Sequence, residues 1–155
     1  MIFSRPCQYA IQAMTSLAVT PDSAVRAEKI AQDEGIPRPI LSKVLQDLVR
    51  KGLLESRRGP GGGFTLSRRP ELITLRDVVA AIDGLDQFYT CVSGLAACSD
   101  EAPCPLHNMW KEMRVGLTQT FETTTLQEMA RAIIQKKQFL GSEKRRAAAR
   151  RKASK

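Results

Sequence analysis

The sequence predicts a mostly α-helical fold: a winged helix-turn-helix with a two-stranded wing, so that β-structure is minor, and a long C-terminal helix. Three observations predict it. Apolar residues recur at helical spacing through residues 8–50, a glycine-rich turn then joins two short strand-like segments, and further helical stretches follow a loop with three cysteines. The 155 residues suit one domain with an appendage.

The first three helices are predicted by apolar periodicity and by the residues that end them. A helix over 8–19 is followed by a second over 26–34, which Gly35 ends. The turn between the second and third helices is short, which is typical of a helix-turn-helix. The third helix starts near Ile40, after two prolines, and its apolar positions form one face: Ile40, Leu41, Val44, Leu45, Leu48 and Val49.

A β-hairpin is predicted directly after the third helix. Residues 53–57 and 64–66 have strand character, and the run Gly59-Pro60-Gly61-Gly62-Gly63 between them is typical of a turn. A turn needs one glycine, and the excess predicts close approach to a partner. With a further helix capped by Thr74, the winged helix-turn-helix domain is expected to span 1–83.

The second half of the chain divides into three parts. Residues 84–105 form a cysteine-rich loop, and residues 106–140 form helices, the last of which begins with a capping box of Thr125 and Glu128. Residues 141–155 are basic and alanine-rich with no apolar face, so we expect a disordered tail.

Charge is distributed unevenly along the chain. The net charge is +8 overall, with +4 over 1–77, −4 over 78–135 and +8 over 136–155. Such asymmetry predicts a polyanionic partner for residues 1–77 and for the basic tail at the C-terminus. The alternative for the tail is that it is only a solvated end.

Double-stranded DNA is the partner that this layout predicts. The second helix of a helix-turn-helix enters the major groove with its N-terminal residues facing the bases, and arginine is favoured in a narrow minor groove. The alternative is a protein-interaction module of the same fold. The candidate DNA-binding residues are Arg38, Pro39, Ser42, Lys43 and Gln46 in the third helix, Arg57, Arg58, Gly59, Pro60, Gly61 and Gly62 in the wing, and Arg5.

Cys91, Cys98, Cys104 and His107 are the candidate metal ligands, with the spacing Cys-x6-Cys-x5-Cys-x2-His. Thiolates suit zinc and iron–sulfur clusters, and gaps wider than those of structural zinc sites favour a cluster over one ion. Zinc, metal-free thiol sensing and three unrelated buried cysteines are the alternatives. His107 is either a ligand or only a helix-start residue. Cys7 is either a further ligand, within or across subunits, or a half-buried thiol.

These features resemble the IscR/NsrR/RirA-type winged-helix regulators, the Rrf2 family, over about residues 1–135. The marks are Tyr9-Ala10, the wing sequence Arg58-Gly59-Pro60-Gly61-Gly62-Gly63-Phe64, and the cysteine–histidine set. The resemblance implies a homodimer on a palindromic operator, and a [2Fe–2S] or [4Fe–4S] cluster held by the three cysteines. It makes 106–140 the dimerisation helices, with Met109, Trp110, Met113, Leu117 and Phe121 at the interface.

The fourth ligand separates the branches of this family. His107 matches the [2Fe–2S] branch that senses iron–sulfur supply, whereas Gln8 stands where other members carry an acidic ligand. The resemblance therefore favours [2Fe–2S] over [4Fe–4S]. The first cysteine gap is one residue longer than in the most similar type, and the prolines at the start of the third helix also differ. The signal thus stays open between cluster supply, iron, NO and redox stress, and the regulator is expected to be a repressor.

Other classes of function fit the sequence less well. A zinc-stabilised interaction module without DNA binding is the alternative of another class. An enzyme is not expected, because a Cys-x-x-Cys pair, a nucleophile–base set and a phosphate-binding motif are lacking, and no small-molecule substrate is expected. No apolar run approaches the roughly 20 residues that span a bilayer, and the N-terminus does not resemble a signal peptide, so no membrane partner and a cytoplasmic location are expected.

Overall fold

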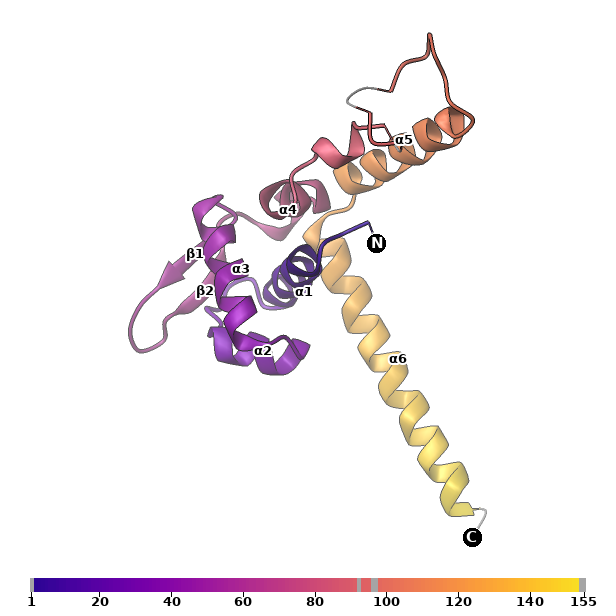
Figure 1. Cartoon of the computed structure of the whole chain (residues 1–155). Helices are drawn as coiled ribbons and strands as arrows, with labels where there is room; N and C mark the ends of the chain where they lie inside the picture. The colour runs from indigo at the N-terminus through magenta and orange to yellow at the C-terminus, as the bar shows by residue number, and fades with distance from the viewer. Residues whose placement is uncertain (1, 92, 96–97, 154–155) are drawn as a thin grey trace.

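A computed structural model describes residues 2–91, 93–95 and 98–153. Parts of the predicted cysteine loop and the last two residues of the predicted tail lie outside these ranges. Helices α1 (Arg5–Val19), α2 (Ala27–Glu34) and α3 (Arg38–Arg50) precede strands β1 (Leu54–Arg57) and β2 (Gly63–Leu66). Helices α4 (Leu75–Ile82), α5 (His107–Thr123) and α6 (Leu126–Ala153) follow, with short 3₁₀ turns at Pro70–Leu72 and Asp86–Phe88. This is the predicted mostly α-helical winged helix-turn-helix (Figure 1).

The helix boundaries follow from capping chemistry. The α1 helix begins at Arg5, before the predicted residue 8, because the Ser4 hydroxyl accepts a hydrogen bond from the backbone N–H of Cys7 at 3.1 Å and Pro6 stands in the first turn. Gly35 ends α2 in the left-handed conformation, with φ of 65°. The capping box predicted at Thr125 and Glu128 is present, since the Glu128 carboxylate accepts from the Thr125 backbone at 2.8 Å.

One core joins the helix-turn-helix to the start of α6. Helix α1 packs against α3, α4 and α6. The fully buried side chains come from all of these elements and include Met14, Leu17, Ile30, Leu41, Leu45, Leu48, Ile73, Val78 and Leu126. A second cluster of Cys7, Leu75, Val79, Phe88 and Phe121 joins α1 and α4 to α5.

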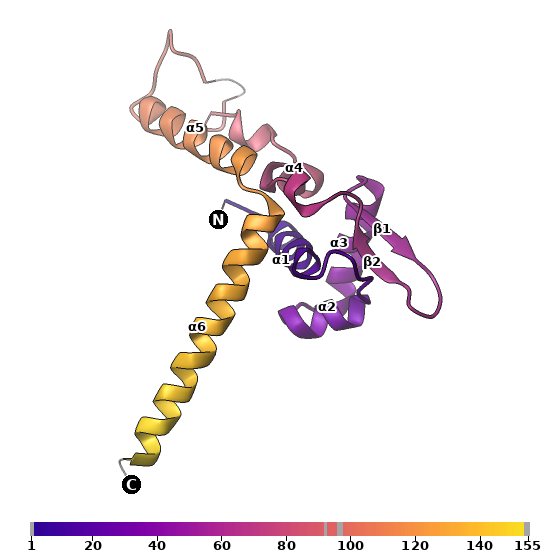
Figure 2. The same ribbon diagram turned by 180° about the vertical axis from the view of Figure 1, so that it is seen from behind.

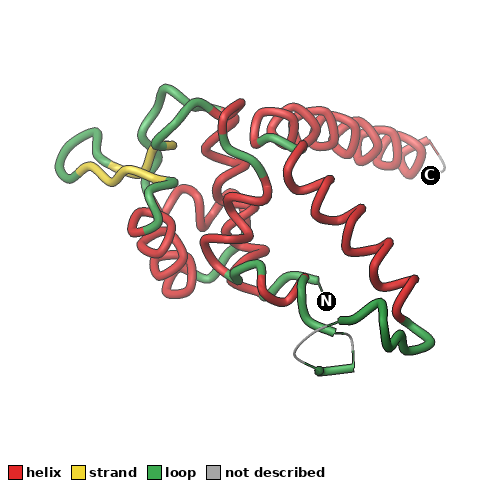
Figure 3. Tube along the Cα trace, turned by 90° about the horizontal axis from the view of Figure 1, so that it is seen from above, coloured by secondary structure: helices red, strands yellow, loops and turns green. Residues whose placement is uncertain are grey.

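The wing is a two-stranded antiparallel hairpin in which Leu54 pairs with Leu66 and Arg57 with Gly63. A contact that the sequence does not predict ties it to the body. Val25, between α1 and α2, exchanges two backbone hydrogen bonds with Phe64, of 3.0 and 2.8 Å. The wing projects from the body away from α5 and α6 (Figures 2 and 3).

The wing glycines are explained by the fold of the wing. A Cβ on Gly63 would lie 2.6 Å from the backbone carbonyl of Val25, and one on Gly62 would collide with the carbonyl oxygen of Arg57. Gly59 and Gly61 adopt positive φ of 93° and 76°, which favours glycine. At Gly62 and Gly63 the close approach is therefore within the chain, and the expectation of a partner at the wing stays a prediction.

Helix α6 differs most from its prediction. It continues to Ala153, whereas the sequence predicts no fixed structure in 141–155. Alanine, lysine, arginine and glutamate have high helix propensity, so this sequence can remain helical without a packing face. In two opposite views α6 extends from the body as a projecting rod (Figures 1 and 2). No helix among the described residues is long and apolar enough to cross a membrane.

Candidate DNA-binding surface and metal centre

The N-terminal half of α3 presents most of the predicted DNA-contacting side chains to solvent. Leu41, Val44 and Leu45 face the core, which leaves the opposite side of the helix free. On that side Arg38, Pro39, Lys43 and Gln46 are exposed and Ser42 is half-buried. Helix α2 precedes α3 across a three-residue turn, Gly35–Pro37, so the structure has the predicted helix-turn-helix.

Arg38 has an intramolecular partner in this structure. Its guanidinium forms an ion pair with the Glu28 carboxylate, in the first turn of α2. Both side chains are exposed, and exposed pairs of this kind contribute little to stability. The guanidinium can therefore exchange Glu28 for another acceptor at small cost.

The wing tip carries two exposed arginines. Arg57 lies 3.8 Å from Glu55, and Arg58, Gly59, Pro60 and Gly61 are exposed beside it. Gly62, also a candidate for DNA contact, is buried in the turn, where its lack of a Cβ allows the chain to close. It shapes the wing and does not itself present a surface.

Arg5 lies apart from these residues. It is exposed at the first turn of α1, next to Ser4, whose backbone N–H donates to Asp83 of the α4 C-terminus at 2.9 Å. In both side views the N-terminus and the wing lie on opposite sides of α1 (Figures 1 and 2). The structure does not bring Arg5 together with α3 and the wing.

The first part of the loop between α4 and α5 is anchored on α5. The buried Phe88 ring lies edge-on to Phe121 of α5, with centroids 5.7 Å apart. The indole N–H of Trp110 donates to the carbonyl of Thr90 at 3.1 Å, immediately before the first cysteine of the loop. The α5 helix thus holds the segment that leads into the cysteines.

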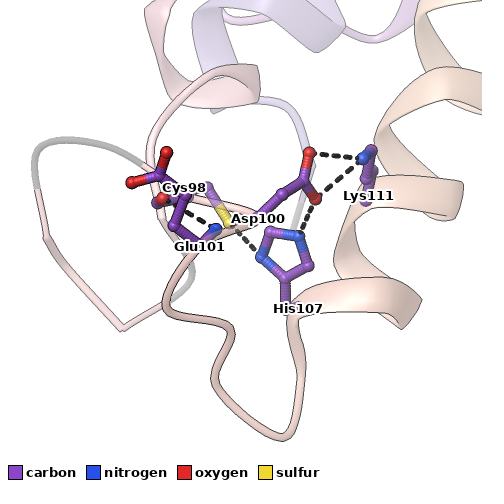
Figure 4. Close-up of polar contacts among 6 residues, drawn as sticks. Cys98, Asp100, Glu101, His107 and Lys111 are labelled. Atoms are coloured by element: carbon purple, nitrogen blue, oxygen red, sulfur yellow. Dashed lines mark hydrogen bonds and ion pairs between the residues drawn. The ribbon is translucent and has the colours of Figure 1, made fainter.

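Among the predicted ligands, the Cys98 side chain contacts those of His107 and Cys91. The Sγ of Cys98 lies 3.1 Å from Nδ1 of His107 (Figure 4). The backbone N–H of His107 donates to the carbonyl of Cys104 at 2.9 Å. Desolvation raises the pKa of Cys98. The negative charge of the Cys91 thiolate and a hydrogen bond with Cys91 raise this pKa further. Hydrogen bonds from Ser93 and from Cys98 lower the pKa of Cys91. All four cysteines of the chain are free thiols.

Asp100 is a member of this site that sequence reasoning missed. Its Oδ1 lies 2.6 Å from Nε2 of His107, and both its carboxylate oxygens accept from Lys111 at 2.8 Å. Hydrogen bonds from Lys111 and then from His107 lower the pKa of Asp100. The only signal in the sequence was weak: Lys111 follows His107 by one helical turn, so a carboxylate in the loop can reach both.

The donor set fits a thiolate-ligated metal centre in its chemistry. Three thiols and an imidazole lie in one loop and at the start of one helix, and soft thiolate ligands suit iron–sulfur clusters or zinc. Within the described residues, no three His, Cys, Asp or Glu side chains already form a metal-binding arrangement. Any metal would therefore have to draw these donors closer together.

Cys7 does not belong to this group. Its side chain is 0% exposed in the cluster of Phe88 and Phe121, and burial together with Asp83 raises its pKa to about 12. The expectation of a half-buried thiol underestimated its burial. The neighbouring Gln8 side chain donates to the carbonyl of Phe3 at 3.3 Å.

The predicted interface residues on α5 separate into two groups. Met109 and Met113 are 50% and 47% exposed, and Val115, which the sequence did not single out, is 60% exposed. Trp110 and Leu117 are half-buried. Phe121 packs against Phe3 and Phe88 within its own chain and is only 6% exposed. It is therefore a core residue here, whereas the sequence placed it at an interface.

Comparisons with known proteins agree on one family. The model of the Rrf2 family, described as iron-dependent transcriptional regulators, matches residues 3–132. A protein of Aquifex aeolicus described as an HTH-type transcriptional regulator is 35% identical over 83% of this chain and 91% of its own. IscR of Klebsiella pneumoniae is 29% identical over 79% of this chain and 75% of its own. The structure of CymR, the global cysteine regulator of B. subtilis, has a TM-score of 0.72 and 25% identity, covering 85% of this chain and 98% of CymR.

Proposed function

Because the chain belongs to the Rrf2 family of transcriptional regulators, we propose that it is a homodimer whose binding to a palindromic DNA operator is controlled by an iron–sulfur cluster. Membership of the family makes the chain a transcriptional regulator and not an enzyme. The observation that carries the cluster proposal is the contact between Cys98 and His107, in the loop that also holds Cys91 and Cys104.

The DNA-binding part of the proposal rests on α3 and the wing. Arg38 and Lys43 on the exposed side of α3 would donate to guanine or to phosphate, and Ser42 and Gln46 would read base edges or bind the backbone. Arg57 and Arg58 at the wing tip would enter the minor groove. Base contacts would supply specificity, and the arginines and lysines would supply salt-dependent affinity.

A homodimer is supported by the apolar surface on α5. Met109 and Met113 are exposed large apolar side chains one turn apart on the same side of α5, and adjacent exposed apolar side chains are typical of an interaction surface. Pairing α5 with its symmetry mate would cover them. Two recognition helices would then be related by a twofold axis, as a palindromic operator requires.

Control by the cluster is supported by the connections of the cysteine loop. The loop leads from α4, which packs against α1 and α3, to α5, so it lies between the helix-turn-helix and the expected dimer helix. Cys91, Cys98, Cys104 and His107 would hold the cluster, with [2Fe–2S] favoured over [4Fe–4S]. When bound, it would supply a centre that responds to iron, cluster supply, NO or redox stress. The residues of the loop would transmit its gain or loss to the spacing or order of the recognition helices.

The test is to purify the full chain without oxygen, record its absorption spectrum and measure iron and sulfide. We expect visible charge-transfer bands with iron and sulfide in near-equal amounts, lost in Cys91→Ala, Cys98→Ala and Cys104→Ala. Cys7→Ala is the matched control, since it removes a cysteine that lies in the core. DNA binding is then measured with and without the cluster. Zinc or no metal in the wild-type protein would refute the cluster and leave a regulator with zinc-bound or redox-sensing thiols.

A further inference from the structure

The imidazole of His107 is engaged through both ring nitrogens. Nδ1 lies 3.1 Å from Sγ of Cys98 and Nε2 lies 2.6 Å from Oδ1 of Asp100 (Figure 4). An ionised carboxylate can only accept a hydrogen bond, so Nε2 must carry the hydrogen. In the neutral ring Nδ1 then has no hydrogen, and its lone pair is directed toward Sγ of Cys98. The two nitrogens thus have different roles, set by Asp100.

Asp100 is itself held in place. Lys111 donates to both of its carboxylate oxygens at 2.8 Å, and Lys111 lies one turn after His107 on α5. The residue that holds Asp100 is therefore on the same helix as the histidine. The His107 side chain is 5% exposed, whereas those of Asp100 and Lys111 are 70% and 48% exposed. A buried ring is thus oriented by two side chains at the surface, which can be changed with little effect on the core.

We propose that Asp100, held by Lys111, is a positioning residue that fixes His107 with its hydrogen on Nε2 and presents Nδ1 as the metal-facing nitrogen. The metal-facing part rests on the proposed function, while the fixed tautomer is a property of the metal-free protein. Histidine ligands in proteins commonly donate their second N–H to a carboxylate, which fixes ring orientation and raises ligand basicity. Asp100, which does not itself contact the metal, would have this role.

The tautomer is measured first, on the metal-free full chain. His107 is the only histidine, so two-bond ¹H–¹⁵N correlation spectra of uniformly labelled protein report this ring alone. At a pH where the ring is neutral, we expect limiting shifts of the Nε2–H form and an Nε2–H proton that exchanges slowly enough to be observed. Asp100→Ala should give the averaged shifts of a free imidazole. Asp100→Asn, which keeps an acceptor oxygen, should largely restore the wild-type pattern.

Glu101→Ala is the matched control. Glu101 is the next residue and an exposed acid, and its backbone N–H donates to the Ser99 hydroxyl at 3.1 Å. It should leave the His107 spectrum unchanged. An Nδ1–H form in the wild-type protein, averaged shifts, or identical spectra for Asp100→Ala and wild type would overturn the proposal.

The metal-facing nitrogen is then identified on the cluster-loaded, reduced protein with histidine labelled at Nδ1 only. Pulsed EPR should detect the labelled nitrogen coupled to the cluster. Loss of Asp100 in Asp100→Ala should speed cluster removal by a chelator about 10–100-fold, and Glu101→Ala should not. Coupling through Nε2, or equal retention in Asp100→Ala, would contradict the metal-facing role. If no cluster assembles, the iron–sulfur proposal fails, and the tautomer measurement still decides the inference.

Discussion

Arg38, one of the candidates for DNA contact on α3, forms an ion pair with Glu28 in the DNA-free protein. DNA binding through Arg38 must break this ion pair. We predict that Glu28→Gln raises operator affinity by up to about fivefold, because an exposed pair contributes roughly 0.2–1 kcal/mol. The measurement is a fluorescence-anisotropy titration at fixed salt.

A general effect of removing an acidic charge must be separated from the release of Arg38. Asp33→Asn, on the same helix, removes one acidic charge whose partner is Lys29 and leaves the Arg38 pair intact. In an Arg38→Ala background, Glu28→Gln should behave like Asp33→Asn. Equal effects of Glu28→Gln with and without Arg38 would show that the pair does not limit binding.

Cys7 gives a prediction for alkaline stability. Its folded-state pKa is raised from 9.0 to about 12, so the folded protein keeps a proton that the unfolded chain releases in this range. The stabilisation from the neutral thiol is therefore complete below about pH 9 and is lost as pH rises toward 12. The free energy of unfolding should fall more steeply between these values in wild type than in Cys7→Ala, as measured by urea denaturation.

The same burial should make Cys7 unreactive. Titration of the native protein with a thiol reagent at pH 8 should label the loop cysteines and leave Cys7 unmodified until the protein unfolds. Equal slopes of stability against pH in wild type and Cys7→Ala would contradict the pKa shift. Rapid labelling of Cys7 in the native state would contradict its burial.

At the scale of elements, two neighbouring capping boxes join α4 to α6. Thr74 pairs with Thr125 across an isolated β-bridge, and each threonine caps its own helix. The Thr74 hydroxyl accepts from the Asp77 backbone at 3.3 Å and the Asp77 carboxylate from the Thr74 backbone at 3.0 Å. We predict that Thr74→Ala lowers the free energy of unfolding by about 1 kcal/mol, measured by chemical denaturation.

Thr123→Ala is the control for this prediction. The Thr123 hydroxyl bonds only to carbonyls of its own helix, at 2.9 Å to Gln119 and 3.5 Å to Thr120. Its loss should change stability by less than about 0.5 kcal/mol, as is usual for a surface substitution. If the two variants were equally stable, the capping box would contribute nothing.

At the scale of the whole molecule, the charge is concentrated at two places. The winged helix half and, more strongly, the end of α6 are basic, whereas the cysteine loop is acidic. Because α6 projects from the body, its basic end could meet a second stretch of phosphate (Figure 1). Such contacts would be sequence-independent and salt-dependent.

We therefore predict that removing residues 141–155 lowers nonspecific DNA affinity at low salt by about tenfold or more and makes its salt dependence shallower. Operator affinity should fall less, so the ratio of specific to nonspecific binding should rise. A variant with the tail's lysines and arginines changed to Gln keeps its length and should behave like the truncation. Unchanged nonspecific binding at low salt in both variants would show that the tail is only a solvated end.

Most of the elements could be predicted from the sequence, and candidate donors of the site could be named from it. Helical spacing located α1 to α6, Gly35 marked the turn of the helix-turn-helix, and the glycine run marked the wing. The cysteine spacing and His107 indicated the candidate donors, two of which, Cys98 and His107, are in contact. All of these depend on residues a few positions apart, so local geometry and turn chemistry determine them.

Only the tertiary structure decided which distant residues meet. It tied Val25 to the wing and brought Asp100 to His107. It also buried Cys7 beside Asp83 and packed Phe121 against Phe3 and Phe88. Sequence periodicity states that a side chain is apolar or buried, but not against which partner. These partners are separated by loops whose closure depends on packing of the whole chain, and no local pattern specifies that packing.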